Sequence, residues 1–223
     1  MIYHDDYRNV IDDLKYDYVF TSPPDFEEIG TDPSKPEVYQ KFLKDLFDRM
    51  NPTKNLITAS VTDRKFGGGI VSKSSLIVTT MESIGYQLKA HKIWVKTLKI
   101  DGWRPTYANV LTFGKGKTKQ NLEKSFKPDV WIHDNEKYKK YAYGMAIDAV
   151  IKCVLNYTVE GDTVYDPFMG SGTTAAAAIR TDRKYVGSEI NEEYFKLSQE
   201  RIHEENIGKM LTYNDKCDIL NTY

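Results

Sequence analysis

A proline-rich turn carries the first group of residues whose types and spacing suit chemistry. It is the hexapeptide Thr-Ser-Pro-Pro-Asp-Phe at residues 21–26, directly after the apolar segment 18–20. The two proline rings fix a rigid extended turn, because each restricts φ and disfavours helix in the residue before it. We expect this turn to present the Ser22 hydroxyl and the carbonyls of Ser22 and Pro23 at the carboxyl edge of a sheet, where open α/β folds bind ligands. A bare diproline would be more typical of a plain surface loop.

A glycine-rich turn carries the second group. The nonapeptide Asp-Pro-Phe-Met-Gly-Ser-Gly-Thr-Thr at residues 166–174 follows a short apolar strand and precedes an alanine-rich helix expected over 173–179. Its glycines allow a ligand to approach the backbone, with the N–H groups of the helix start directed at it. It lacks the Gly-Lys-Ser/Thr end of a P-loop and the three-glycine spacing of the dinucleotide fingerprint. A Gly-Ser-Gly turn alone is more typical of a simple strand–helix connection, but the whole nonapeptide is more specific.

Together, the two turns resemble the motifs of S-adenosylmethionine-dependent DNA amino-methyltransferases, which methylate the exocyclic amine of cytosine or adenine. The glycine turn is similar to their cofactor motif, and residues 21–24 are similar to their catalytic motif. The catalytic motif comes first here, which is the permuted order of the beta group. The resemblance covers roughly residues 1–206. It implies a cytoplasmic enzyme of DNA methylation, as in restriction-modification, from a bacterial or phage-infected cell.

The resemblance also implies a set of site residues. Glu189 ends the strand expected over 184–189, where its carboxylate suits both ribose hydroxyls of the cofactor. Asp6 is a less specific candidate for cofactor contact, because Asp5 and Asp6 fit equally well as two solvated acids near the N-terminus. The implied cofactor contacts are Asp6, Thr21, Asp166, Pro167, Phe168, Gly170, Ser171, Gly172, Thr173, Glu189 and Ile190. The implied catalytic residues are Ser22, Pro23, Pro24 and Asp25, with Phe26 at the target base and no metal.

The chemistry of an aromatic amine gives these catalytic residues their expected roles. Hydrogen bonds from the amine to the Ser22 hydroxyl and the Pro23 carbonyl would make its nitrogen more tetrahedral, so that the lone pair meets the sulfonium methyl. The base must first leave the duplex. Serine at the head of the motif favours cytosine N4 over adenine N6. Methylation at cytosine carbon-5 is disfavoured, because neither Cys153 nor Cys217 lies near the diproline.

Asp25 is a departure from the family pattern, which usually has an aromatic residue after the diproline. Stacking on an aromatic ring is worth ~1–3 kcal/mol per base. Asp25 could instead bind a modified base, or Phe26 could take over the stacking. A third alternative is a weakly active or inactive partner subunit that only binds cofactor.

DNA contact must come from a local patch, because the formal net charge is only −1. The most basic segment is 114–140, which the motif order marks as a short target-recognition insert. A solvated lysine-rich loop is the alternative. The expected DNA contacts are Lys115, Lys117, Lys119, Trp131 and His133.

The fold expected is a single methyltransferase domain over 1–223, a Rossmann-like three-layer α/β sandwich. Its mostly parallel sheet should have about seven strands, with 86–94 and 107–113 pairing as a hairpin that includes the one antiparallel strand. Helices are expected at 36–50, 72–84, 141–155 and from 191 to about 205, and a flexible loop at 67–69. Residues 207–223 remain open between a tail and a partner-binding extension. No apolar run suits a membrane span, and the oligomeric state stays open, with a homodimer among the options.

Overall fold

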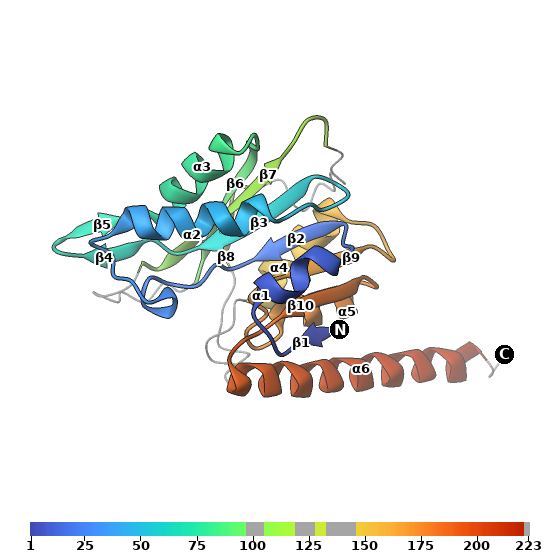
Figure 1. Cartoon of the computed structure of the whole chain (residues 1–223). Helices are drawn as coiled ribbons and strands as arrows, with labels where there is room; N and C mark the ends of the chain where they lie inside the picture. Colours follow the sequence, from blue (N-terminus) through green and yellow to red (C-terminus); the bar gives the residue numbers. More distant parts are fainter. Residues whose placement is uncertain (97–104, 119–127, 133–145, 221–223) are drawn as a thin grey trace.

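A twisted eight-stranded sheet forms the centre of the computed structural model (Figure 1), which describes residues 1–96, 105–118, 128–132 and 146–220, with side chains up to residue 209. The strand order is β1-β10-β9-β2-β3-β7-β6-β8. Within this sheet β7 runs antiparallel to both of its neighbours, and every other adjacent pair is parallel. The strands are β1 (Ile2–Tyr3), β2 (Tyr18–Thr21), β3 (Leu56–Val61), β6 (Gln87–Val95), β7 (Tyr107–Gly114), β8 (Val130–Ile132), β9 (Thr163–Asp166) and β10 (Lys184–Ser188).

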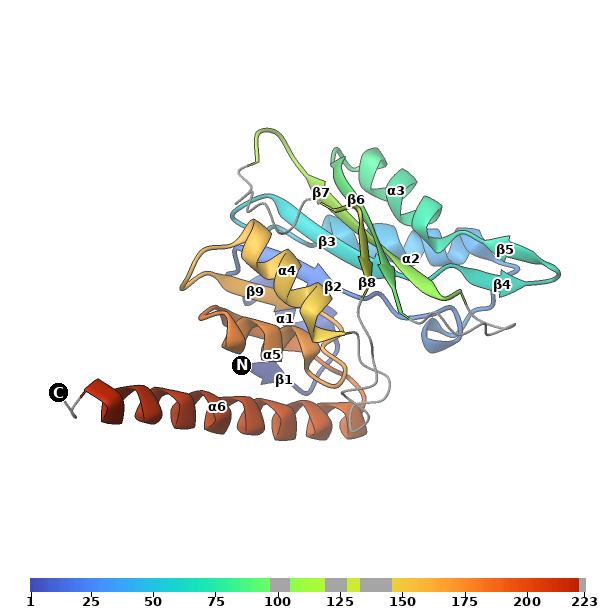
Figure 2. The same cartoon turned by 180° about the vertical axis from the view of Figure 1, so that it is seen from behind.

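Helices cover both faces of the sheet, as Figures 1 and 2 show from opposite sides. One core cluster joins α1, α2 and α3 to the sheet, and a second joins α4 and α5 to its other face. The strands supply both clusters because successive side chains point to opposite faces: Val19 enters the first, and Tyr18 and Phe20 enter the second. The helices are α1 (Tyr7–Val10), α2 (Pro36–Asp48), α3 (Lys73–Ser83), α4 (Ile147–Tyr157), α5 (Thr173–Arg180) and α6 (Glu192–Leu220), with 3-10 turns at Ile11–Asp13 and Glu27–Ile29.

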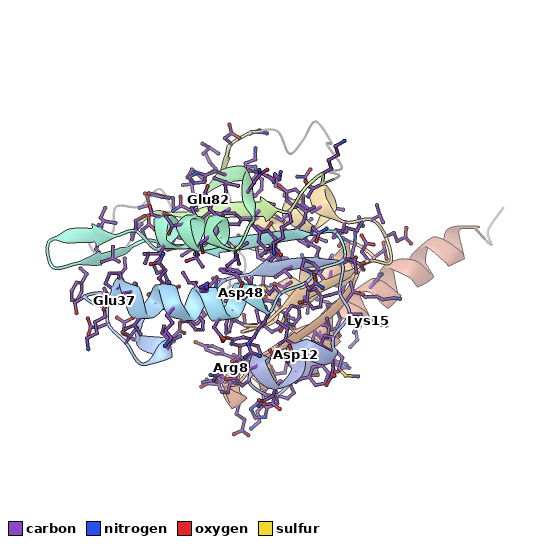
Figure 3. All side chains as sticks on the ribbon, turned by 45° about the horizontal axis from the view of Figure 1, so that its top comes forward. Arg8, Asp12, Lys15, Glu37, Asp48 and Glu82 are labelled. Carbon is purple, nitrogen blue, oxygen red and sulfur yellow. The ribbon has the colours of Figure 1, made fainter. Side chains whose placement is uncertain are left out.

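The outer faces of the helices that cover the sheet are polar. Glu37 and Asp48 on α2 and Glu82 on α3 are exposed and lie on the surface of the molecule (Figure 3). Tyr39, Leu43 and other apolar residues of α2 are buried against the sheet. This is the division expected of an amphipathic helix on a sheet. Among the described residues, no helix is both long and apolar enough to cross a membrane.

The expected α/β sandwich and its single antiparallel strand are confirmed, and so is the hairpin of β6 and β7. Two helix ends are also as expected. The Asn191 side chain caps α6 by accepting from Tyr194 N at 3.0 Å, and Gly85 follows α3 with a φ of +87°.

Three expectations need correction. The sheet has eight strands rather than about seven, because β8 lies inside the segment expected as a recognition insert. Residues 67–69 are not a flexible loop: Gly67 and Gly68 form the turn of a separate hairpin, β4 (Arg64–Phe66) with β5 (Gly69–Val71), and Gly69 begins β5. Helix α6 continues to Leu220 instead of ending near 205, and it extends past the body of the molecule (Figure 2). Helix α4 is described from Ile147, and the 141–145 part of that prediction lies outside the described residues.

The close packing of β9 against β10 gives a prediction on stability. A Cβ added at Gly187 would lie 2.3 Å from the Asp166 carbonyl oxygen and 2.5 Å from Met169 Cε. We expect Gly187→Ala to lower the free energy of unfolding by ~1–3 kcal/mol, because the strands must separate to accept the methyl group. Urea unfolding measures this.

The matched control is Gly208→Ala in α6. A Cβ there would meet nothing within 4 Å, so alanine should raise stability by roughly 0.5–1 kcal/mol through its helix propensity. If Gly187→Ala were as stable as wild type, this would contradict the close packing of β9 against β10.

Candidate active site

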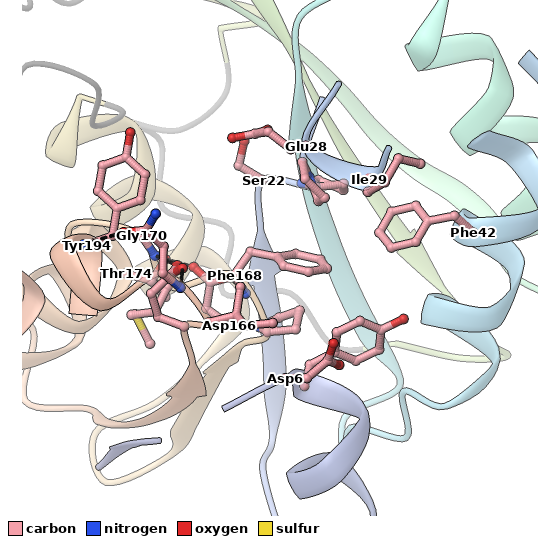
Figure 4. Close-up of a pocket in the computed structure, with 18 of the residues that line it drawn as sticks. Asp6, Ser22, Glu28, Ile29, Phe42, Asp166, Phe168, Gly170, Thr174 and Tyr194 are labelled. Atoms are coloured by element: carbon pink, nitrogen blue, oxygen red, sulfur yellow. Dashed lines mark hydrogen bonds between the residues drawn. The ribbon is translucent and has the colours of Figure 1, made fainter. Parts of the chain in front are cut away.

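One pocket of about 1140 Å³ opens at the carboxyl ends of β1, β2, β9 and β10, and Figure 4 shows it in close-up. It is lined by both motifs singled out in the sequence, although they are more than a hundred residues apart. The lining includes most of the expected site residues, namely Asp6, Ser22, Pro23, Pro24, Asp166, Pro167, Phe168, Gly170, Ser171, Thr173, Glu189 and Ile190. The pocket therefore joins the proline turn to the glycine turn.

Parallel strand pairing is what brings the two motifs together. Val19 of β2 pairs with Tyr165 of β9, and Gly187 of β10 pairs with Asp166. Neighbouring parallel strands end at the same edge of the sheet. The residues that directly follow β2, β9 and β10 must therefore meet there.

Hydrogen bonds to the end of β10 fix the glycine turn. Met169 N donates to the Ser188 carbonyl at 2.9 Å, and the Ser188 hydroxyl donates to the Pro167 carbonyl at 3.0 Å. Gly172 has a φ of +83°, and a Cβ there would lie 3.2 Å from Ser198 Cα of α6. Glycine is needed at this position both for its backbone conformation and for its size.

Glu189 ties the glycine turn to the start of α6. Its Oε2 accepts from Gly170 N at 2.8 Å, and its Oε1 accepts from Asn191 N at 2.8 Å. Each carboxylate oxygen can accept a second hydrogen bond. The side chain is thus held in one orientation while it keeps acceptor capacity for the two hydroxyls of a diol.

Asp166 is a buried carboxyl group beneath the pocket. Burial raises its pKa to about 7, although hydrogen bonds from the Thr174 hydroxyl at 2.6 Å and from Phe168 N at 3.1 Å act in the opposite direction. Desolvation disfavours the charged form, whereas donors favour it. Asp166 therefore orients the turn through Thr174 and Phe168 rather than standing open to solvent.

An aromatic wall continues the pocket beyond the glycine turn. The ring of Phe168 lies 5.3 Å from the Tyr7 ring in an edge contact and 6.1 Å from the Phe42 ring. Asp6 stands at the same end and is held by Arg8, whose Nε and Nη2 donate to it at 2.9 and 2.6 Å. These hydrogen bonds hold the pKa of Asp6 below its ordinary value. Figure 4 shows Asp6 and Phe42 beyond Phe168, away from Gly170 and Tyr194.

The proline turn presents Ser22 on the other side of the pocket. Ser22 is exposed, and its hydroxyl makes no hydrogen bond with any residue that the structure describes. The Pro24 carbonyl accepts from the Tyr39 hydroxyl at 2.9 Å. Helix α2 thus braces the turn and leaves the serine open to a ligand.

Asp25 and Phe26 follow the turn but do not line the pocket. Lys73 Nζ lies 3.2 Å from Asp25 Oδ1, and Arg64 Nη1 lies 3.5 Å from Asp25 Oδ2. The ring of Phe26 is fully buried, and its centroid lies 4.5 Å from that of Tyr39. Phe26 is therefore part of the core here and does not face the pocket. Thr21 and Gly172 are also absent from the lining.

The residues expected to contact DNA are not brought together. Gly114 at the end of β7 pairs with Leu56 at the start of β3, so Lys115 and Lys117 lie at the amino-terminal edge of the parallel strands, opposite the pocket. Lys115 Nζ lies 4.3 Å from the centroid of the Tyr86 ring. Trp131 is buried against the core beneath Lys152, while Lys119 and His133 lie outside the described residues.

The sequence analysis missed several lining residues, most of which lie on α1, α2 and α6. Phe42 was assigned to core packing because it lies on the apolar stripe of its helix, and Tyr7 has no motif around it. Tyr194 ends the run at residues 187–194 that resembles the family, but no role was expected of it. The missed residues with aromatic or charged side chains are Asp5, Tyr7, Arg8, Phe20, Glu28, Lys41, Phe42, Asp45 and Tyr194. Only the order of the strands in the sheet, which brings these segments to one edge, could have assigned these residues to the pocket.

A family model for DNA methylases, covering the N6 and N4 enzymes, matches residues 16–200. The chain belongs to this family of DNA amino-methyltransferases, as the two motifs predicted.

Individual proteins agree with this assignment. The orphan methyltransferase M.BamHII of Bacillus amyloliquefaciens is 53% identical over 49 residues, which are 22% of this chain and 18% of that protein. The chain therefore aligns with about a fifth of the length of this relative. Two solved structures share the fold over most of both chains.

The first solved structure is TTHA0409 of Thermus thermophilus complexed with S-adenosyl-L-methionine, with a TM-score of 0.71, 21% identity, and coverage of 92% of this chain and 93% of that one. The second is the cytosine-N4-specific PvuII DNA methyltransferase, with a TM-score of 0.78, 17% identity, and coverage of 90% and 85%. At these identities the likeness shows the Rossmann-like methyltransferase fold, which is confirmed.

The raised pKa of Asp166 gives a prediction on pH. Its folded-state pKa of about 7 lies above the ordinary 3.8, so the folded protein holds this proton more tightly than the unfolded chain does. The free energy of unfolding should therefore fall as pH rises from about 4 to about 7. Asp166→Asn keeps an oxygen acceptor but cannot ionise, so it should remove this loss, which is worth ~2–4 kcal/mol.

Urea unfolding of both proteins at several pH values measures the difference between their slopes. The variant should gain stability relative to wild type as pH rises. Parallel pH profiles would show that Asp166 is not a buried acid with a raised pKa.

Proposed function

We propose that this protein transfers the methyl group of S-adenosylmethionine to an exocyclic amine of DNA, with cytosine N4 as the target. The observation that carries the proposal is the single pocket that joins Glu189 and the glycine turn to Ser22 and the diproline. One side can hold a nucleoside cofactor, and the other offers acceptors to an amine. A pocket with both halves suits a transfer reaction between two bound molecules.

The cofactor side fits S-adenosylmethionine by the chemistry of its groups. The Glu189 carboxylate keeps one acceptor position on each oxygen for the two ribose hydroxyls. Phe168, set between Tyr7 and Phe42, offers an apolar surface for the adenine ring, with Asp6 at the same end. Ser171 and Thr173 line the pocket at the start of α5, where backbone N–H groups are available.

On the amine side, the residues of the proline turn provide position and polarity. The cofactor supplies an electrophilic methyl group on a positively charged sulfur. The Ser22 hydroxyl, which has no partner in the described structure, and the Pro23 carbonyl would accept the two amine hydrogens. This would weaken the delocalisation of the nitrogen lone pair into the base. The turn is rigid and braced by Tyr39, so the acceptors are in place before the base arrives.

Asp25 acts as a positioning residue in this proposal. Its carboxylate contacts Lys73 and Arg64 rather than the pocket, and the Lys73 side chain is only 6% exposed. The ion pairs connect the proline turn to α3 and to the β4–β5 hairpin. This arrangement favours an enzyme with a fixed turn over one in which Asp25 binds a modified base, and Phe26 takes no part in stacking because it is buried.

DNA is the proposed partner, with the target base flipped out of the duplex. A base inside the stack cannot bring its amine into the pocket beside Ser22, whereas a flipped base can. The serine at the head of the motif supports cytosine over adenine. Adenine N6 is the alternative target for the same pair of acceptors.

The cofactor side can be tested by calorimetry. We expect S-adenosylmethionine to bind, and Glu189→Ala to weaken binding by ~1.5–3 kcal/mol, because hydrogen bonds to a charged acceptor are lost. Glu189→Gln keeps one oxygen acceptor and should lose less. If Glu189→Ala bound S-adenosylmethionine as tightly as wild type, Glu189 would not hold the ribose.

The reaction can be tested by incubating the protein with labelled S-adenosylmethionine and DNAs of varied sequence, followed by mass spectrometry of the nucleosides. We expect N4-methylcytosine. Ser22→Ala should slow methyl transfer ~tenfold, through loss of one hydrogen bond, and leave cofactor affinity unchanged. N6-methyladenine in place of N4-methylcytosine would overturn the choice of base. Cofactor binding without methylation of any DNA would instead indicate an inactive partner subunit.

A further inference from the structure

The β4–β5 hairpin, residues 64–71, projects from the sheet on the side of the pocket. It begins just after Val61 at the carboxyl end of β3 and extends beyond the start of α2 (Figure 1). Gly67 and Gly68 form its turn with φ values of +58° and +78°. Positive φ at both central residues is typical of a tight two-residue hairpin turn. The hairpin is thus a narrow, defined projection.

The base of the hairpin is anchored next to the proline turn. Arg64 Nη1 lies 3.5 Å from Asp25 Oδ2, and Arg64 Nη2 lies 2.5 Å from Glu27 Oε1. On the other side, Asp63 Oδ1 accepts from Ser74 N at 2.9 Å at the start of α3. Asp25 follows Pro24 of the pocket directly, so the hairpin has a fixed position relative to Ser22.

The tip of the hairpin carries exposed apolar side chains between basic ones. Phe66 is 45% exposed and Ile70 is 66% exposed. Lys65, next to Phe66, is also exposed, whereas Arg64 and Lys73 are held in ion pairs with Asp25 and Glu27 at the base of the hairpin. An exposed apolar tip beside an exposed lysine suits a duplex, in which phosphates surround stacked bases.

Strand geometry places Phe66 on the side of the hairpin that faces the proline turn. Alternate residues of a strand point to the same face, so Phe66 shares the face of Arg64, which contacts Asp25. Two residues of a strand span ~7 Å, so Phe66 lies about that far beyond the Arg64 anchor. Ile70 pairs with Lys65 and therefore belongs to the opposite face.

We propose that the β4–β5 hairpin is a DNA-contacting wedge whose Phe66 ring enters the base stack at the place that the flipped base leaves. This rests on the proposed function, because it requires a target base that leaves the duplex. Apolar side chains that insert between base steps compensate for lost stacking. Here the wedge would stand outside the pocket, and Asp25 and Arg64 would keep it in register with Ser22.

The experiment compares wild type, Phe66→Ala and Ile70→Ala on two synthetic duplexes that carry the methylated site found for the wild type. In one duplex the target base is paired, and in the other it faces an abasic position. We expect Phe66→Ala to slow single-turnover methylation about tenfold or more on the paired duplex, because extrusion costs a few kcal/mol. On the unpaired target it should stay within about twofold of wild type, since little extrusion is needed.

Ile70→Ala is the matched control, because it removes an exposed apolar side chain from the opposite face of the same hairpin. It should resemble wild type on both duplexes. An equal loss in the two variants would overturn the assignment to Phe66, as would an equal loss of Phe66→Ala on both duplexes or no loss on either. A change of oligomeric mass in Phe66→Ala would show that a second copy of the chain occupies this tip instead.

A binding measurement separates failure of the wedge from failure of the proposed function. By fluorescence anisotropy, wild type should bind a duplex with one abasic position more tightly than a fully paired one, and Phe66→Ala should lose this preference. If wild type shows the preference and Phe66→Ala loses it, but wild type methylates no DNA, the proposed function fails while contact of Phe66 with the base stack stands. If wild type methylates DNA but Phe66→Ala matches it in both assays, the wedge fails and the function stands.

Discussion

The hydrogen bonds of the Glu189 carboxylate are the constraint on which the candidate site depends most. One side chain at the end of β10 accepts from Gly170 N in the glycine turn and from Asn191 N at the start of α6. Three segments are therefore held at one corner of the sheet. Because these donors are backbone groups, the corner is specified by the course of the chain. Glu189 also lines the pocket.

A second corner is built from ion pairs around Asp25. Lys73 and Arg64 connect the proline turn to α3 and to the β4–β5 hairpin, while Tyr39 braces the same turn from α2. The residue that departs from the family pattern thus has a structural role. The family's aromatic residue is replaced at this position by a carboxylate that connects the proline turn to α3 and to the β4–β5 hairpin.

The sequence was most informative where local signals coincide with a motif. Short apolar strands that end in a proline turn, a glycine turn or an acid predicted three of the four strand ends that form the pocket. The family resemblance supplied the order of the two motifs along the chain. The sequence was least informative for contacts between segments that lie far apart along the chain. The Lys73–Asp25 pair spans 48 residues, and no local pattern marks it. The position of Lys115 and Lys117 has no local signal either: β7 is antiparallel, so its end lies at the edge opposite the pocket. Their contact with DNA stays a prediction.

The central claim is that the cofactor and the target amine meet in one pocket between Glu189 and Ser22. A crystal structure with a non-reactive analogue of S-adenosylmethionine tests it most directly. The account predicts both ribose hydroxyls within hydrogen-bonding distance of the Glu189 carboxylate, the adenine beside Phe168, and the group that replaces the methyl directed toward Ser22. An analogue bound with its ribose away from Glu189, or with that group directed away from the proline turn, would contradict the account.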